Sequence, residues 1–222
     1  MLDAARIAEL LQPFLGDTPV PPGLYTQLKI YLDLLLRWNA RMNLTAVREP
    51  EQIVMRHFGE SLFAARRLRE SGAFDSAEDV PIHLADLGSG GGFPGIPSKL
   101  FAPELHITLI ESQNKKATFL REVVRALVLS HIVVHCGRAE TWGHTADVVT
   151  LRAVEKFEDV VPVAARLVAP DGTLALLIGE SQARAAADLL GPGWKAAASH
   201  RIPESEGRAV WLAQRQSADD RP

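Results

Sequence analysis

The sequence is poor in cysteine, in long apolar runs and in targeting signals. One cysteine, Cys136, stands among 222 residues, which excludes an intramolecular disulfide and a cysteine-only metal site. A reducing cytoplasm is the compartment that this composition favours. The longest apolar block near the start, residues 32–36, is interrupted by Asp33 and is too short to cross a membrane. The opening MLDAARIAEL lacks the basic stretch of a signal peptide, so none is expected.

A basic excess is also missing, because the formal net charge is −3. A domain built mainly to bind nucleic acid is expected to be basic, so the overall charge argues against that class. The charge is uneven, however. Between Lys29 and Arg69, eight basic residues stand against four acidic ones. On charge alone, solvated helix faces explain this segment better than a binding surface does.

Two periodicities divide the chain into an N-terminal helical region, residues 1–70, and an α/β core, residues 80–216. Before residue 70, apolar side chains recur every three or four positions, and helices are expected after Gly23 and after Pro50. A polar, turn-rich linker follows. Then short apolar runs alternate with helical patterns, which predicts a mostly parallel sheet with an antiparallel hairpin at its edge. The expected strands are Ile82–Leu87, Ile107–Ile110, Ile132–His135, Val148–Leu151 and Leu174–Ile178, and the expected helices include Lys115–Leu129 and Phe157–Val168.

The densest motif is the glycine loop HLADLGSGGGFPGIP at residues 83–97. Gly90, Gly92 and Gly95 form a G-x-G-x-x-G pattern after a predicted strand, which is typical of dinucleotide-binding folds. Three features oppose a pyrophosphate here. Asp86 would repel it, the two prolines of FPGIP remove N–H donors, and no G-K-[ST] ending follows.

A cationic ligand fits the same loop better. S-adenosylmethionine carries a sulfonium, an ammonium and a single carboxylate, so Asp86 would attract it. Gly88 and Gly90, on either side of Ser89, would let the backbone approach its methionine portion closely. A second acid is expected at the end of the next strand, to bind the ribose hydroxyls. In ITLIES, Glu111 stands there.

Candidate residues also follow the third and fourth strands. Ala139 and Glu140 could contact adenine through a backbone N–H and a carboxylate, but without further context a surface ion pair of Arg138 with Glu140 is the better interpretation. Arg152 would border the methyl acceptor, where arginine can neutralise a phosphate or bind a guanine edge. Its alternative is a salt bridge to Glu155 or another nearby acid.

Histidine and cysteine fit structural roles better than catalytic ones. His57 lies alone on a predicted helix, where packing or capping is the commoner role. The other histidines show no metal-ligand spacing, so no metal is expected. Cys136 lies on a predicted core strand, which predicts a small buried hydrophobe.

Missing motifs also narrow the type of methyl transfer. Methylation of a pyrimidine carbon needs a cysteine nucleophile, and Cys136 is badly placed for it. Methylation of a base amine usually relies on an Asn/Asp-Pro-Pro-aromatic motif, whereas this chain reads TLRAVEKF after the fourth strand. Transfer to an atom that is already nucleophilic, such as guanine N7, needs only alignment and exclusion of water. A small-molecule methyltransferase that works by proximity remains an alternative.

Five segments resemble, in order and spacing, the bacterial small-subunit ribosomal RNA guanine-N7 methyltransferases, a family also called glucose-inhibited division protein B. They are WNARMNLTAV, RHFGESL, DLGSGGGFPGIP, GRAE and DVVTLRAV. The resemblance implies a cytoplasmic monomer that methylates a guanine in a conserved loop of 16S RNA. It implies cofactor contacts at Gly88, Phe93, Ala139, Glu140 and Arg152. Two positions depart from the family pattern: Glu60 replaces the usual aspartate, and Ile178 replaces a frequent lysine.

We therefore predict an α/β, class I, Rossmann-like methyltransferase with an N-terminal helical extension, acting on 16S ribosomal RNA or the small subunit. Alternatives are a small-molecule methyltransferase, a dinucleotide-dependent oxidoreductase, and a non-catalytic RNA-binding module that retains a cofactor pocket. Arg152 is the expected catalytic residue. The expected S-adenosylmethionine-binding residues are Asp86, Gly88, Ser89, Gly90, Phe93, Glu111, Ala139, Glu140 and Arg152. Salt-dependent RNA binding is expected from Arg41, Arg48, Arg56, Lys115 and Lys116.

Overall fold

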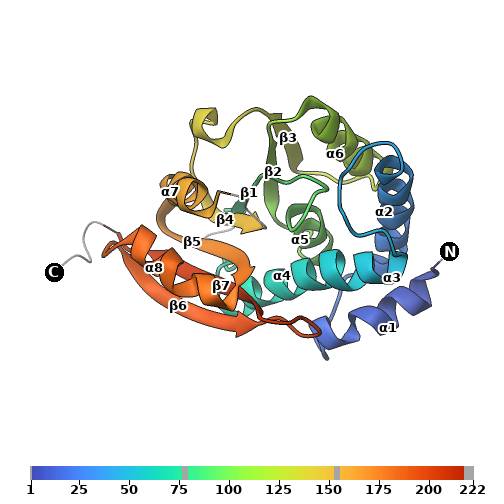
Figure 1. Ribbon diagram of the computed structural model, residues 1–222, viewed down its shortest axis with the longest axis horizontal. Coiled ribbons are helices and arrows are strands. Elements are labelled where there is room, and N and C mark those ends of the chain that lie inside the picture. Colours follow the sequence, from blue (N-terminus) through green and yellow to red (C-terminus); the bar gives the residue numbers. More distant parts are fainter. Residues whose placement is uncertain (1, 77–79, 153–155, 218–222) are drawn as a thin grey trace.

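The computed structural model describes residues 2–76, 80–152 and 156–217 (Figure 1). Its N-terminal part is helical, as the apolar period predicts. The helices are α1 (Ala4–Leu15), α2 (Leu24–Asn39) and a continuous run of α3 (Pro50–Ile53), η1 (Val54–Gly59) and α4 (Glu60–Glu70). Asp3 caps α1 by accepting a hydrogen bond from Arg6 N at 2.8 Å, and Pro50 stands in the first turn of α3. The middle of the run is a π-helical turn, a feature often found at functional sites.

The second part is a seven-stranded sheet in the order β3-β2-β1-β4-β5-β7-β6. The strands are β1 (His83–Leu87), β2 (His106–Glu111), β3 (Ile132–Cys136), β4 (Ala146–Arg152), β5 (Val168–Gly179), β6 (Trp194–Arg201) and β7 (Arg208–Arg215). The first five are parallel, and β7 runs antiparallel to both β5 and β6. The predicted parallel sheet and its antiparallel edge hairpin are confirmed.

Helices cover both faces of this sheet (Figure 1). One apolar cluster joins α4, α5 (Gly95–Phe101) and α6 (Asn114–Ala126) to the N-terminal helices. A second cluster joins α7 (Phe157–Leu167) and α8 (Ala183–Leu190) to the other face. Two short helices, η2 (Ala139–Thr141) and η3 (Glu180–Gln182), complete the connections. Covered faces explain why the central strands read as nearly continuous apolar runs.

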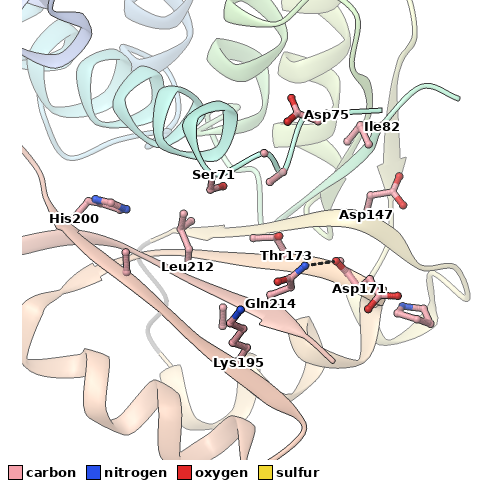
Figure 2. Close-up of a pocket in the computed structure, with 16 residues that line it drawn as sticks. Ser71, Asp75, Ile82, Asp147, Asp171, Thr173, Lys195, His200, Leu212 and Gln214 are labelled. Carbon is pink, nitrogen blue, oxygen red and sulfur yellow. Dashed lines mark hydrogen bonds between the residues drawn. The ribbon is translucent and has the colours of Figure 1, made fainter. Parts of the chain in front are cut away.

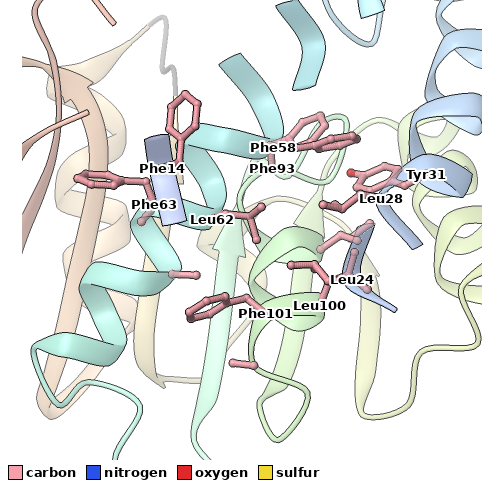
Figure 3. Packing of buried hydrophobic residues seen from close by; sticks show 14 of the residues in the cluster. Phe14, Leu24, Leu28, Tyr31, Phe58, Leu62, Phe63, Phe93, Leu100 and Phe101 are labelled. Carbon is pink, nitrogen blue, oxygen red and sulfur yellow. The ribbon is translucent and has the colours of Figure 1, made fainter. Parts of the chain in front are cut away.

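The N-terminal helices share their core with the sheet domain (Figure 3). Tyr31 of α2 packs on Phe58 of η1 and on Phe93 of the glycine loop, with ring centroids 5.1 and 5.5 Å apart. Each fully buried side chain of this size contributes roughly 1.5–3 kcal/mol. The helical region therefore holds the glycine loop from one side, while the boundary between residues 70 and 80 stays a prediction.

One expectation about the core is wrong. Cys136 does lie on a strand, but β3 is the edge of the sheet, so its side chain is only half-buried. Its Sγ donates to Asn114 Oδ1 at 2.9 Å instead of packing as a small hydrophobe. Within the described ranges, no helix combines the length and the apolar character that crossing a membrane requires.

Candidate functional site

The glycine loop begins where β1 ends, at the carboxyl edge of the sheet. Gly88, Gly90 and Gly92 have φ of +66°, +55° and +92°, which side chains rarely tolerate. A Cβ on Gly92 would collide with the hydroxyl of Tyr31, which donates to Gly91 O. A Cβ on Gly88 would meet nothing within 4 Å. The loop is thus packed tightly on the helix side and open on the other.

Asp86 lies fully buried beneath this loop. Its carboxylate accepts hydrogen bonds from Thr150 Oγ1 at 2.8 Å and from Gly95 N at 3.1 Å. Burial raises its pKa to about 6, against the opposing effect of these hydrogen bonds. Asp86 therefore supports the loop from below, and a direct contact of Asp86 with a cofactor stays a prediction. The neighbouring Ser89 hydroxyl likewise donates inward, to Asp86 O at 2.9 Å.

Glu111 ends β2 beside the loop, as expected, and is 5% exposed. Its two oxygens accept hydrogen bonds from Gly90 N at 3.0 Å and from Gln113 N at 2.8 Å. A carboxylate oxygen has two lone pairs, so each oxygen can accept one further bond, such as one from a ribose hydroxyl.

A cavity of about 430 Å³ opens at this edge of the sheet. Its volume lies in the range of small-molecule sites. Of the predicted residues, Gly88, Ala139, Glu140 and Arg152 line it together. Glu140 also forms the ion pair with Arg138, at 3.4 Å, but both side chains are exposed, so the pair contributes little. The predicted residues Asp86, Ser89, Gly90, Phe93 and Glu111 do not line the cavity and lie in or against the loop behind it.

Arg152, at the end of β4, forms a buried polar cluster on the wall of this cavity. Its Nη2 lies 2.8 Å from Arg56 O, 2.9 Å from His57 Nδ1 and 3.0 Å from Glu60 Oε2. Arg208, from β7, lies 3.1 Å from the same Glu60 oxygen. Glu60 is therefore the nearby acid of the salt-bridge alternative. The Glu60 and Arg152 side chains are only 3% and 8% exposed. Because two arginines share one carboxylate, the cluster has a net positive charge.

Glu155, the other acid considered for Arg152, lies outside the described residues. Ile178, at the position where the family resemblance leads us to expect a lysine, is buried at the end of β5. Its side chain packs in the second apolar cluster.

His57 belongs to this cluster, although it was expected only to pack or cap. Its Nε2 lies 2.6 Å from Thr45 Oγ1, and its ring stacks on Phe93 at 5.0 Å. Burial, together with the positive charge of Arg152, lowers the pKa of His57 to about 2. With Nδ1 facing an arginine donor, the network assigns the proton of the neutral ring to Nε2. Only its place in the RHFGES motif signalled this role.

The cavity fits a ligand that accepts hydrogen bonds. Arg152 Nε is buried and has no partner among the described residues. A buried donor left unpaired costs free energy, which an acceptor on a ligand would offset. Together with the open side of Gly88, this donor fits a molecule with a carboxylate, such as S-adenosylmethionine.

The predicted RNA-binding residues are spread over two regions. Arg41, Arg56 and Lys115 are exposed, and Lys116 is half-buried. Arg48 is exposed but has a structural role, because its Nη1 and Nη2 donate to Asn39 O and Asn43 Oδ1, both at 2.8 Å.

Comparison with known proteins assigns the fold and the family. A magnesium protoporphyrin IX methyltransferase from Synechocystis PCC 6803, solved with bound SAM, matches with a TM-score of 0.62 over 84% of this chain and 97% of its own, at 13% identity. A ribosomal protein L11 methylase from Lactobacillus delbrueckii subsp. bulgaricus matches with a TM-score of 0.55 over 72% and 80%, at 16% identity. These likenesses confirm the class I S-adenosylmethionine-dependent methyltransferase fold.

The sequence relatives are more specific. A ribosomal RNA small subunit methyltransferase G from Xylella fastidiosa is 41% identical over 182 residues, which are 80% of each chain. One from Xanthomonas axonopodis pv. citri is 40% identical over 181 residues, with the same coverage. The GidB family model, described as rRNA small subunit methyltransferase G, matches residues 24–189. The chain therefore belongs to the GidB family, as its five motifs predict.

Proposed function

We propose that this protein uses S-adenosylmethionine to methylate guanine N7 in 16S ribosomal RNA. The observation that carries the proposal is the cofactor-sized cavity lined by Arg152, which is ion-paired with the buried Glu60, in a chain of this family. The names of the relatives supply the small-subunit ribosomal RNA as substrate. The choice of N7 rests on the chemistry of the site.

The cofactor would lie along the cavity from the loop to η2. Gly88 would face its methionine portion, and Arg152 Nε would donate to its carboxylate. Glu111 would accept from the ribose hydroxyls, and Ala139 and Glu140 would contact the adenine. Bound there, S-adenosylmethionine supplies an electrophilic methyl group on a sulfonium.

The residues around Arg152 favour an acceptor that needs no deprotonation. His57 holds its ring between Arg152 and Thr45, and with a pKa near 2 it is a poor proton acceptor at neutral pH. Asp86 is buried beneath the loop. Guanine N7 carries an exposed lone pair, so alignment and exclusion of water suffice for its reaction.

RNA binding would come mainly from Arg41, Arg56, Lys115 and Lys116, with affinity falling as salt rises. We assign Arg48 a smaller part, since its guanidinium is held by the loop after α2. A monomer in the cytoplasm completes the proposal.

The test is methylation of 16S RNA from cells that lack the gene, offered both as naked RNA and as assembled small subunits. The radiolabelled methyl group of S-adenosylmethionine should be transferred to the RNA, leaving S-adenosylhomocysteine, and mass spectrometry should find one N7-methylguanosine. Calorimetry should show binding of S-adenosylhomocysteine but not of NAD. Binding without any label in RNA would support a non-catalytic module, and binding of NAD alone would support an oxidoreductase.

A further inference from the structure

A second cavity, of about 550 Å³, lies on the other side of Glu60. It is formed by the end of α1, the run from α3 to α4, and the turn between β6 and β7. Glu60 lines this second cavity and Arg152 lines the first, so their 3.0 Å ion pair stands between the two. The two cavities therefore border the same ion pair from opposite sides.

Glu60 offers this cavity an unused acceptor. Both arginines approach its Oε2, at 3.0 and 3.1 Å. Its Oε1 accepts no hydrogen bond from the described part of the chain, although the side chain is only 3% exposed. A nearly buried carboxylate oxygen of this kind is best satisfied by an N–H group of a ligand.

Arg208 offers donors beside that acceptor. Its guanidinium forms an ion pair with Glu60, and its Nε is buried without a partner among the residues described. The Arg208 side chain lines the cavity and is 22% exposed, so its guanidinium N–H groups lie next to the Glu60 carboxylate, which is the pattern needed to bind a polar edge with an acceptor beside a donor.

The remaining wall favours a base over a phosphate. Phe14, Met55 and Pro203 supply apolar surface. Three carboxylates, those of Glu60, Glu204 and Glu206, outnumber the two arginines that line the cavity, so its charge opposes an anion. Enzymes that modify a base take it out of its stack and bind it through apolar contacts and its Watson–Crick edge. Guanine presents O6 beside N1–H on that edge, whereas adenine presents the reverse order.

We propose that the second cavity receives the acceptor guanine, with Glu60 Oε1 accepting from N1–H and Arg208 donating to O6. This leaves the N7 lone pair unengaged. Glu60 and Arg208 are then specificity residues for the base, and Glu60 also positions Arg152. The inference rests on the proposed function and adds to it the residues that select guanine.

The test replaces the target guanine by 2-aminopurine, which keeps N7 but has no O6 and carries a lone pair at N1. The RNA is assembled by ligation, and kcat/KM is measured for both bases. The wild type should prefer guanine by about 100-fold or more, since two hydrogen bonds to charged groups are lost. In Glu60→Gln the amide N–H can donate to the N1 lone pair, so the preference should fall to about tenfold.

Because the preference is a ratio within one protein, partial loss of folding or of Arg152 alignment cancels. Arg208→Gln should lower the ratio about tenfold, and it keeps the test decisive if Glu60→Gln does not fold. Glu204→Gln, an exposed acid on the same cavity, should leave the ratio unchanged. An undiminished ratio in both Glu60→Gln and Arg208→Gln would overturn the inference. A wild type inactive on the guanine RNA would instead overturn the proposed function.

Discussion

Two cavities of similar volume lie at opposite ends of the sheet. The one at the amino end, about 450 Å³, is lined by the starts of β1, β4 and β5 with residues of β6 and β7 (Figure 2). Two of its polar side chains form hydrogen bonds within the chain. Asp147 Oδ2 accepts from His83 N at 2.8 Å, and Gln214 Nε2 donates to Asp171 O at 3.3 Å. The cofactor cavity described above, about 430 Å³, lies at the carboxyl end and is lined by Arg152, whose Nε has no partner among the described residues.

The difference shows that volume does not identify a site. None of the buried side-chain nitrogens or oxygens that lack a partner in the described residues belongs to the amino-end cavity. A buried donor without a partner reduces stability unless a ligand satisfies it, so the Nε of Arg152 favours the carboxyl-end cavity as the ligand site.

The largest effect that separates the two ends is expected from Arg152→Ala. This change removes a donor from the cofactor cavity and frees Glu60 from its principal partner. We expect kcat/KM for RNA methylation to fall about 100- to 1,000-fold, the range for loss of one preorganised donor. Lys195→Ala, at an exposed position of the amino-end cavity, is the matched control and should stay within about twofold. Similar losses in both variants would erase the distinction between the two ends.

A pH effect on stability should arise at Asp86. Its folded-state pKa of about 6 exceeds its ordinary value of 3.8, so the folded protein holds a proton that the unfolded chain has released. Stability from this group is present below about pH 4 and is lost as pH rises through 6, by on the order of 3 kcal/mol. Urea unfolding at several pH values should therefore show the wild type losing stability relative to Asp86→Asn between pH 4 and 7. Parallel curves for the two proteins would contradict the raised pKa.

The sequence predicts the strands and the glycine loop at the carboxyl end better than it predicts the polar cluster around Arg152. Strand periodicity and glycine spacing depend on neighbouring residues, so β1, the loop and Glu111 were predictable. Arg152 meets Glu60 across 92 positions, and that meeting depends on how the N-terminal helices pack on the sheet. Arg208 joins from the edge hairpin for the same reason. Cys136 was misjudged because a strand's own residues do not reveal whether the strand is central or at an edge.

The smallest effect, and the sharpest comparison, comes from two glycines. Gly88 and Gly191 have φ of +66° and +69°, and a Cβ on either meets nothing within 4 Å. Alanine at either position should therefore reduce stability, by at least about 1–2 kcal/mol. Only Gly88 lines the cofactor cavity, so only Gly88→Ala should weaken S-adenosylhomocysteine binding, by about tenfold in calorimetry. Because both variants place a methyl group in open space at a positive-φ position, a loss of affinity confined to Gly88→Ala reports the methyl group in the cavity. Equal affinities would mean that the open space beside Gly88 does not face the cofactor. The glycine loop would then no longer distinguish the carboxyl-end cavity from the amino-end cavity as a cofactor site.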